Sequence, residues 1–357
     1  MRKIQANDYV IELGRIVESD FSLLLNTKYK KAKKIILVDE NTHDYCLEFL
    51  ITTFEELKEA EVMLLPVGEE NKVLEVCFQV WEALSEYKIS RKDLIINLGG
   101  GVVSDMGGFI ASIYKRGIDF INIPTTLLSM VDASVGGKTG VDLGRFKNQI
   151  GTFTNPKGLF VDVSFLSTLP QNEVLNGFAE MLKHGLIASK TYWQELTSLA
   201  SMDDLITEKL VCTSIDIKNE IVKSDPKEAN ERKKLNFGHT IGHGLEGFFL
   251  ASDPIGHGHA VGIGMLAESF ISFKRGILPE TDWNEISEVL MALFPLLPIS
   301  SEDIDTIIEL MRNDKKNSED QIKSCLLTSV GSCIYDQDLS IEEIKESLYF
   351  LIAKHDQ

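Results

Sequence analysis

Short runs of β-branched and other apolar residues alternate with helical patterns through the first half of this chain of 357 residues. The runs lie at residues 34–38, 61–65, 93–98, 119–123 and 158–163. Strands separated by helices are joined by crossover connections, so this alternation predicts a mostly parallel, Rossmann-like sheet in an α/β fold. Beyond Pro170 the apolar spacing becomes helical, at residues 173–188, 203–223 and 239–250.

Two domains fit this change of pattern and the length of the chain, which exceeds what one core usually holds. We expect an α/β domain over residues 1–165 and an all-α domain over residues 166–357. Ligand sites often form between domains, so we expect the active site in the cleft between these two.

The composition narrows the classes of partner. A formal net charge of −18 argues against general affinity for nucleic acid or anionic membranes, because both need a basic face. The first residues lack the apolar core of a signal peptide, and no apolar run reaches the roughly 20 residues that span a bilayer. Five scattered cysteines without a CxxC pair favour reduced, structural thiols. We therefore expect a cytoplasmic protein with no nucleic-acid or membrane partner.

Three glycines, Gly99 to Gly101, join the strand-like run at 93–98 to a helical pattern at 102–114. Glycines at such a junction let the backbone approach a diphosphate, whose charge the helix N-terminus stabilises. The turn alone is ambiguous, because GGG is not the GxGxxG fingerprint and tight packing can also demand glycine. Polar residues after the neighbouring strands support a dinucleotide, since they fall at the same sheet edge. They are Asp39, Asn41, Gly68, Glu69 and Lys72.

The stretch at residues 124–151 combines many small residues with charged ones. Gly136 and Gly137 stand directly before Lys138, as expected of a loop wrapped around an anion. The alternative is a glycine-rich surface loop with solvated lysines. The run is too apolar between its charges for a flexible linker, which favours the anion site.

Four of the seven histidines fall close together in the second half. They are His239, His243, His257 and His259. Histidine is the commonest metal ligand, and such clustering is hard to assign to packing. A carboxylate from another helix is expected as a further ligand, with Glu180 the best candidate and His184 a competitor. Two histidines and one carboxylate leave an open coordination position, as a catalytic metal site requires.

Six blocks of sequence together resemble the 3-dehydroquinate synthases, lyases of the shikimate pathway (EC 4.2.3.4) that serve aromatic amino acid biosynthesis. The blocks are LGGGVVSDMGGF, IPTTLLSMVDASVGGKTGV, KNQIGTF, GFAEMLKHG, LNFGHTIGHGLE and HGHAVGIGM. The resemblance implies conversion of 3-deoxy-D-arabino-heptulosonate 7-phosphate to 3-dehydroquinate and phosphate. It implies transient oxidation by bound NAD, phosphate elimination, re-reduction, ring opening and aldol closure, with one divalent metal ion, zinc or cobalt. The substrate would be a small anionic sugar phosphate, and we expect a homodimer.

Carried over block by block, the resemblance places the metal on Glu180, His239 and His257 and gives His243 a role in proton transfer. Cationic and polar side chains would hold the substrate's phosphate and carboxylate. These substrate contacts are Arg116, Asp132, Lys138, Asn148, Lys183, Lys218, Arg232 and Asn236. The NAD contacts are Asp39, Asn41, Glu69, Lys72, Gly100, Gly101, Val102, Asp105, Thr125, Thr126, Lys138, Lys147 and Thr168.

The chain departs from the family pattern in the last block, where His259 stands in place of the usual glutamate. His257 and His259 thus compete as metal ligands, and we favour His257. Which of Lys315 and Lys316 contacts phosphate stays open, as does the metal used. Two alternatives are another sugar phosphate cyclase and a polyol oxidoreductase of the glycerol dehydrogenase type. An uncharged polyol would need no such set of cations, which argues against the second.

Overall fold

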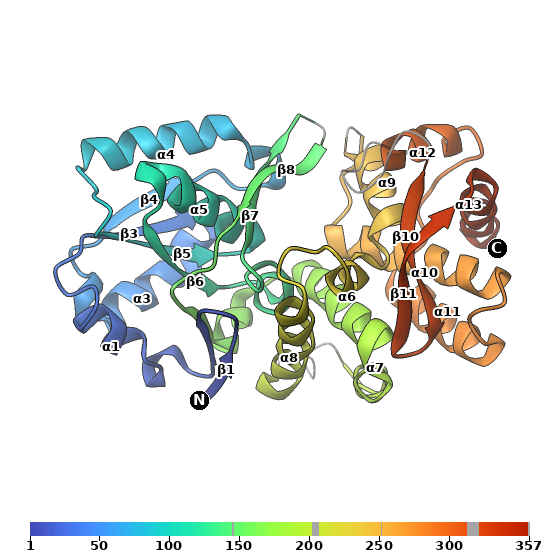
Figure 1. Cartoon of the computed structure of the whole chain (residues 1–357), viewed down its shortest axis with the longest axis horizontal. Coiled ribbons are helices and arrows are strands. Elements are labelled where there is room, and N and C mark those ends of the chain that lie inside the picture. Colours follow the sequence, from blue (N-terminus) through green and yellow to red (C-terminus); the bar gives the residue numbers. More distant parts are fainter. Residues whose placement is uncertain (145, 202–206, 251, 313–320, 356–357) are drawn as a thin grey trace. The chain divides into compact units, whose positions relative to one another are not determined.

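The computed structural model describes residues 1–144, 146–201, 207–250, 252–312 and 321–355 (Figure 1). The chain forms two compact units. Unit 1 comprises Met1–Val174 and Ile206–Asn219, and unit 2 comprises Leu175–Leu205 and Glu220–Gln357. The chain therefore crosses between the units three times, whereas the two domains predicted from the sequence meet at a single boundary, which stays a prediction. Among the described helices, none has both the length and the apolar character needed to cross a membrane.

Unit 1 is built on a seven-stranded sheet with the order β1-β2-β9-β6-β5-β3-β4. The strands are β1 (Arg2–Gln5), β2 (Val10–Leu13), β3 (Lys34–Asp39), β4 (Glu61–Leu65), β5 (Leu94–Gly99), β6 (Asp119–Pro124) and β9 (Leu159–Val161). The β1–β2 pair is antiparallel and the other pairs are parallel. The mostly parallel sheet is confirmed, and all five strand-like runs appear in it. The sequence reading missed β1 and β2, whose four residues are too short for a periodic signal.

Continuous apolar runs place β3, β5 and β6 in the middle of this sheet, because parallel strands covered on both faces need them. Ile95, Ile96 and Phe120 are almost completely buried. Helix α5 packs its Val103, Met106 and Phe109 into the same core. The α-helices that lie wholly within the described residues of unit 1 are α1 (Phe21–Asn26), α2 (Glu40–Thr42), α3 (Glu48–Thr53), α4 (Leu74–Glu86) and α5 (Gly101–Ile113), and two further helices are shared with unit 2.

The sequence predicted an anion-binding loop within residues 124–151, on the evidence of Gly136 and Gly137 before Lys138. These two glycines do lie outside helices and strands, with φ of 101° and 65°, but the residues from 138 onward do not continue the loop. They form an antiparallel hairpin of β7 (Lys138–Leu143) and β8 (Phe146–Phe153). Gly140 lies opposite Gly151, and a Cβ on Gly151 would lie 2.3 Å from the Thr139 carbonyl oxygen. Glycine is therefore needed at these two positions for close strand contact, which the sequence analysis did not predict.

Unit 2 is mainly helical, as predicted, but it is not all-α. Its helices are α7 (Lys190–Thr197), α9 (His239–Phe249), α10 (His257–Lys274), α11 (Glu280–Leu293), α12 (Ile304–Arg312) and α13 (Ile341–His355), with parts of α6 (Gln171–Ala188) and α8 (Glu208–Ser224). Two strands, β10 (Ile322–Ser329) and β11 (Ser332–Leu339), form an antiparallel hairpin (Figure 1). The sequence reading missed it because a short apolar run does not distinguish a strand from a buried helix.

Helices α9 and α10 pack backbone against backbone. A Cβ on Gly264 of α10 would lie 1.9 Å from the carbonyl oxygen of Gly238, which directly precedes α9. Such an approach is open only to glycine. The first residues of these two helices are His239 and His257, so this close packing sets the distance between two of the predicted metal ligands.

Candidate functional site

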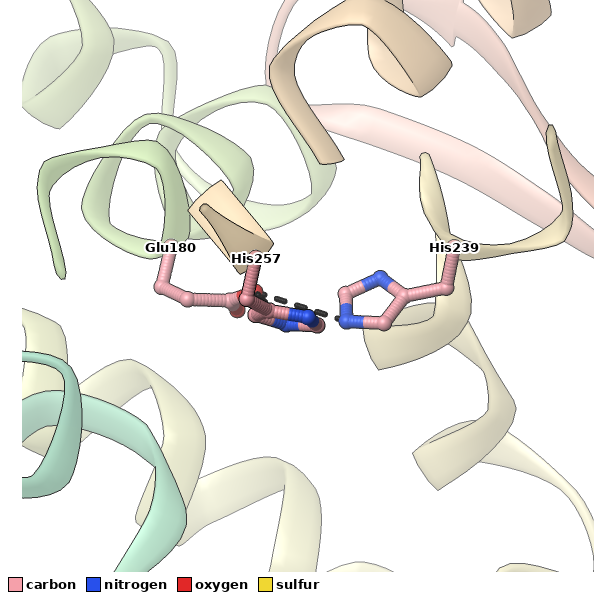
Figure 2. Close-up of side chains that lie close together, drawn as sticks. All are labelled: Glu180, His239 and His257. Carbon is pink, nitrogen blue, oxygen red and sulfur yellow. Dashed lines mark ion pairs between the residues drawn. The ribbon is translucent and has the colours of Figure 1, made fainter. Parts of the chain in front are cut away.

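Glu180, His239 and His257 converge in unit 2 from helices α6, α9 and α10 (Figure 2). One carboxylate oxygen of Glu180, Oε1, lies 3.4 Å from His239 Nε2 and 3.7 Å from His257 Nε2. Glu180 is completely buried, and the two imidazoles are partly buried. One potential ligand atom from each residue lies within 4.8 Å of the other two.

The second ring nitrogen of each histidine contacts an acceptor, which fixes the tautomer. His239 Nδ1 lies 3.1 Å from the Phe237 carbonyl oxygen, so Nδ1 carries the proton and donates. His257 Nδ1 lies 3.4 Å from Glu246 Oε2 and donates in the same way. Both Nε2 atoms are thereby left as acceptors facing Glu180. This is the arrangement found around metal-bound histidines.

The charge state of the cluster also suits a metal. Burial, and then the nearby Lys183 charge, lower the pKa of His239 to about 4, so the ring is neutral at pH 7. Burial opposes ionisation of Glu180, but the adjacent Lys183 ammonium holds the pKa of this carboxyl well below its usual range. A neutral imidazole and an ionised carboxylate are the forms that coordinate metals.

Two observations test whether these residues fit a divalent metal ion. Ligands about 2.1 Å from one tetrahedral ion lie about 3.4 Å apart, which is close to the distances from Glu180 Oε1 to His239 Nε2 and His257 Nε2 given above. Glu180 Oε2 contacts the Lys183 ammonium, while the buried Oε1 receives no hydrogen bond among the described residues. The residues present therefore fit a zinc- or cobalt-sized ion.

The remaining histidines differ in how close they lie to these three residues. His243 forms a second possible ligand group with Glu246 and His257, whose ligand atoms also lie within 4.8 Å of one another. His243, one turn after His239, lies with its ring centroid 5.2 Å from that of His239 and 6.0 Å from that of His257. His259 Nε2 donates instead to the Pro295 carbonyl oxygen at 2.5 Å. Of the two competing residues, the structure therefore brings His257 to Glu180. His184, which the sequence analysis considered as a metal ligand in place of Glu180, is completely buried in the same helix.

The glycine turn of unit 1 lies where the sequence predicted. β5 ends at Gly99, and Gly100 is the N-cap of α5. No side chain caps this helix among the described residues, and its first turn carries no acidic residue, so its N–H groups suit an anion. Val102 lies in the same first turn. At the end of the adjacent strand β6, Thr125 Oγ1 is buried and lacks a hydrogen-bond partner within the described part of the chain.

Predicted NAD and substrate residues meet at Lys72. Its Nζ, almost fully buried, donates to Asp105 Oδ2 at 2.7 Å and to Asn148 Oδ1 at 2.8 Å. Glu69 Oε1 lies 3.7 Å from Lys72 Nζ and equally far from Lys147 Nζ. Burial opposes the charge of Lys72, but the carboxylates of Asp105 and Glu69 raise its pKa overall, so the lysine stays cationic.

A second pair of predicted residues joins α8 to the segment before the hairpin. Lys218 Nζ lies 2.6 Å from both the Asp132 carbonyl oxygen and its Oδ1 carboxylate oxygen. Lys218 is buried, and Asp132 is partly exposed. The ammonium is thus held at one fixed point of unit 1.

The polar loop before α9 holds the predicted Arg232 and Asn236. Asp225 accepts backbone hydrogen bonds from Ala229, Asn230 and Arg232, which closes the loop over this carboxylate. The buried Arg232 donates from Nη1 to the Pro226 carbonyl oxygen at 2.7 Å. Asn236 Nδ2 donates to Glu228 Oε1 at 2.9 Å.

Other predicted residues stand apart from these clusters. Asp39 caps α2 by accepting the Thr42 backbone N–H at 2.7 Å, and Asn41 is exposed in that helix. Thr126 caps the following turn by accepting from the Ser129 N–H. No hydrogen bond or ion pair among the described residues joins the exposed Arg116 or Thr168 to another predicted residue. Lys138 begins β7. Lys315 and Lys316 lie outside the described residues.

The sequence reading missed carboxylates that hold the predicted residues in place. Asp142 accepts the Asn148 N–H at 2.6 Å, and its own N–H donates to the Lys72 carbonyl oxygen. Glu246 contacts the His257 ring, as described above. Glu246 follows His239 by seven residues and therefore shares its helix face, which is a signal that could have found it.

Comparison with known proteins identifies the family. The family model for the N-terminal part of 3-dehydroquinate synthase matches residues 62–176, and the model for the C-terminal part matches residues 177–317. A 3-dehydroquinate synthase of Parabacteroides distasonis is 42% identical over 330 residues, which cover 92% of this chain and 93% of the relative. One from Clostridium botulinum is 38% identical, covering 92% of this chain and 94% of the relative.

Solved structures share the fold over nearly the whole chain. A 2-deoxy-scyllo-inosose synthase, complexed with carbaglucose-6-phosphate, NAD+ and Co2+, is 25% identical, with a TM-score of 0.83 and coverage of 97% of this chain and 98% of that one. A probable glycerol dehydrogenase from Sinorhizobium meliloti is 13% identical with a TM-score of 0.62, covering 100% and 99%. The family models and the curated relatives agree, and the chain belongs to the 3-dehydroquinate synthase family.

Proposed function

We propose that this chain converts 3-deoxy-D-arabino-heptulosonate 7-phosphate to 3-dehydroquinate and phosphate, with NAD and one divalent metal ion. The observation that carries the proposal is the convergence of Glu180, His239 and His257 beside a buried lysine, in a chain of this family. Support for the cofactors comes from the structurally similar inosose synthase, which was solved with NAD+, Co2+ and a sugar phosphate analogue.

The metal is proposed to bind to a carboxylate oxygen of Glu180 and to the Nε2 atoms of His239 and His257. Bound there, the ion supplies Lewis-acid polarisation of the substrate hydroxyl that is oxidised. Phe237 and Glu246 orient the two imidazoles through their Nδ1 protons. Lys183 contacts Glu180 and is proposed also to contact the substrate.

The N-terminus of α5, with Gly100, Gly101 and Val102, is proposed to bind the diphosphate of NAD. Bound NAD supplies a hydride acceptor that is restored within each turnover, so no reduced cofactor is released. Thr125 offers a buried hydroxyl that lacks a partner among the described residues, at the end of the neighbouring strand. Other proposed contacts are Asp39, Asn41, Glu69, Lys72, Asp105, Thr126, Lys138, Lys147 and Thr168.

The cationic residues are proposed to neutralise the phosphate and carboxylate of the substrate. Lys138, Lys218 and Arg232 are the main candidates, because a doubly anionic ligand needs charge-assisted hydrogen bonds. Asn148, Asn236, Asp132 and Arg116 complete the proposed set. His243 lies beside His239 and His257. It is proposed to transfer a proton at its ring nitrogen, and not to bind the metal.

The test is a paired assay of purified protein supplied with NAD and metal. Phosphate release from the heptulosonate phosphate, with no accumulation of NADH, is the expected result. Steady accumulation of NADH on glycerol would instead identify a polyol oxidoreductase. Turnover of glucose 6-phosphate or sedoheptulose 7-phosphate in preference to the heptulosonate phosphate would identify another sugar phosphate cyclase.

We also propose that the protein acts as a homodimer in the cytoplasm. The acidic composition and the biosynthetic role of the family support the compartment. Size-exclusion chromatography with light scattering measures the mass in solution, and a mass of about one chain of 39.9 kDa would contradict the dimer.

A further inference from the structure

Glu268 is a completely buried carboxylate in the middle of α10. Its Oε1 accepts the backbone N–H groups of Thr240 at 3.0 Å and Ile241 at 3.2 Å. Its Oε2 accepts the Gly238 N–H at 2.8 Å and the Ser324 hydroxyl at 2.7 Å. Each oxygen therefore accepts two of these hydrogen bonds, and neither oxygen donates one. This is the pattern of an ionised carboxylate, which can only accept.

Three of these donors form the N-terminus of α9. Gly238 is the N-cap, in a left-handed backbone conformation (φ 79°) that favours glycine, and glycine has no side chain with which to cap the helix. The first N–H groups of a helix have no partner within the helix, and burying them unpaired costs free energy. An anion placed there accepts their hydrogen bonds and is stabilised by the helix dipole. Glu268 thus caps α9 from a neighbouring helix, and Ser324 attaches β10 to the same carboxylate.

The cap acts on the peptide that orients His239. Glu268 accepts the N–H of the Phe237–Gly238 peptide, and the carbonyl oxygen of that same peptide accepts the Nδ1 proton of His239. A negative charge at the N–H end of a peptide strengthens its carbonyl as an acceptor, because hydrogen bonds in series polarise one another. The carboxylate is therefore linked through one peptide to the imidazole whose Nε2 faces Glu180.

We propose that Glu268 is a positioning residue for the metal centre, acting through the Phe237–Gly238 peptide on His239. The inference rests on the proposed role of His239 as a metal ligand. Glu268 fixes the start of α9 to α10, and so fixes His239 relative to His257, before the metal binds. Preorganised ligands bind a metal more tightly than ligands that must first be ordered.

The test is the affinity of the full-length protein for Co2+, measured by competition with a chelator, together with the visible absorption of the bound cobalt. Glu268→Gln keeps the shape but turns an amide NH2 toward two donors. Loss of a group hydrogen-bonded directly to a metal-binding histidine weakens metal binding by about 10-fold to 100-fold. Because Glu268 acts through one intervening peptide, we expect Glu268→Gln to weaken binding by about 10-fold, the lower end of that range, and to shift the cobalt spectrum.

Asp282→Asn is the matched control, because Asp282 is also buried in unit 2 and accepts a backbone N–H, that of Val330 at 2.9 Å, away from α9. It is expected to lower thermal stability while leaving the cobalt affinity and spectrum unchanged. Ser324→Ala removes one donor to Glu268 and is expected to weaken cobalt binding in the same direction by a smaller factor. It keeps the test decisive should Glu268→Gln fail to fold.

Glu180→Gln separates this inference from the proposed function. Glu180→Gln is expected to bind cobalt weakly. If it does, while Glu268→Gln and Ser324→Ala both keep the wild-type affinity and spectrum, the role of Glu268 alone is overturned. With Glu268→Gln unfolded, wild-type affinity in Ser324→Ala would overturn it equally. Wild-type affinity in Glu180→Gln would overturn the proposed metal centre and this inference together.

Discussion

The ammonium of Lys183 contacts the carboxylate of Glu180 one turn earlier in α6, and both side chains are buried. The pair balances the charge of a proposed metal ligand before any metal binds. A buried carboxylate deprived of its cation is destabilised by about 3–5 kcal/mol.

Lys183→Met is therefore expected to destabilise the metal-free protein by about 3 kcal/mol and the metal-loaded protein much less, because the ion then balances Glu180. Chemical denaturation with and without Zn2+ measures both values. Equal destabilisation in the two states would contradict the prediction. Turnover should fall in either case, since Lys183 is also a proposed substrate contact.

His239→Ala and His243→Ala are expected to differ in kind although the residues are one turn apart. His239→Ala removes a proposed Nε2 ligand and should lose metal and activity together. His243→Ala should retain stoichiometric metal while its kcat falls by about 100-fold or more, as expected for loss of an acid–base group. Metal content by atomic emission and steady-state rates on the same preparations measure the difference.

The pair His257 and His259 tests which histidine of the HGH sequence is the ligand. The His257 ring faces Glu180, whereas His259 Nε2 donates to the Pro295 carbonyl oxygen. His257→Ala should lose metal, and His259→Ala should keep it with a small loss of stability, about 1 kcal/mol. The reverse result would show that His259 is the ligand.

Gly264→Ala is expected to destabilise the protein by about 3 kcal/mol, because the new Cβ would overlap the Gly238 carbonyl oxygen across the α9–α10 contact. Gly247→Ala in α9 is the matched control. Its Cβ would meet only Leu310 side-chain carbons at 3.6 Å or beyond, an ordinary contact, and alanine favours helix by up to about 1 kcal/mol. Urea titrations of both variants give the comparison, and similar losses in the two would argue against the backbone contact.

The pair Arg275 and Glu343 predicts a pH dependence of stability. Two hydrogen bonds from Arg275, at 2.6 and 2.8 Å, lower the pKa of Glu343 from 4.5 to about 2. A depressed carboxyl pKa contributes stability that is complete above about pH 4.5 and is lost as pH falls toward about 2. Glu343→Gln should therefore cost about 1–2 kcal/mol at pH 6 after allowance for solvent screening, and less at pH 3.5. Glu346→Gln, at an exposed position of the same helix, is the control, and its difference in stability from the wild type should be small and the same at pH 6 and pH 3.5.

The central strands could be predicted from the sequence because their burial leaves a continuous apolar signal. Ile95 and Ile96 face opposite sides of the sheet, and both must be apolar. The hairpin at 138–153 was missed because the loop inferred from Gly136 and Gly137 was extended over the whole glycine-rich stretch, whereas Gly140 and Gly151 serve a strand contact. The hairpin of unit 2 lacked a period long enough to identify.

The residues of the candidate site likewise fall into those that the sequence reveals and those that it does not. Histidines spaced along one helix are visible in the sequence, and Glu180 was identified because it lies in a recognisable block. Glu268 and Asp142 were not, because each acts through backbone N–H groups, and any residue type offers those. Glu268 lies 30 residues from Gly238, so no local spacing connects them.

The division of α8 between the two units has a consequence for synthesis on the ribosome. The contacts Arg2–Asp216, Asn219–Gln5 and Lys218–Asp132 all tie this helix to unit 1. The first two of these contacts join the first strand to residues more than 200 positions later. The sheet unit therefore cannot complete its folding when its own strands have emerged, and must wait until residue 219 has left the exit tunnel, when segment 175–205 of the other unit is already made.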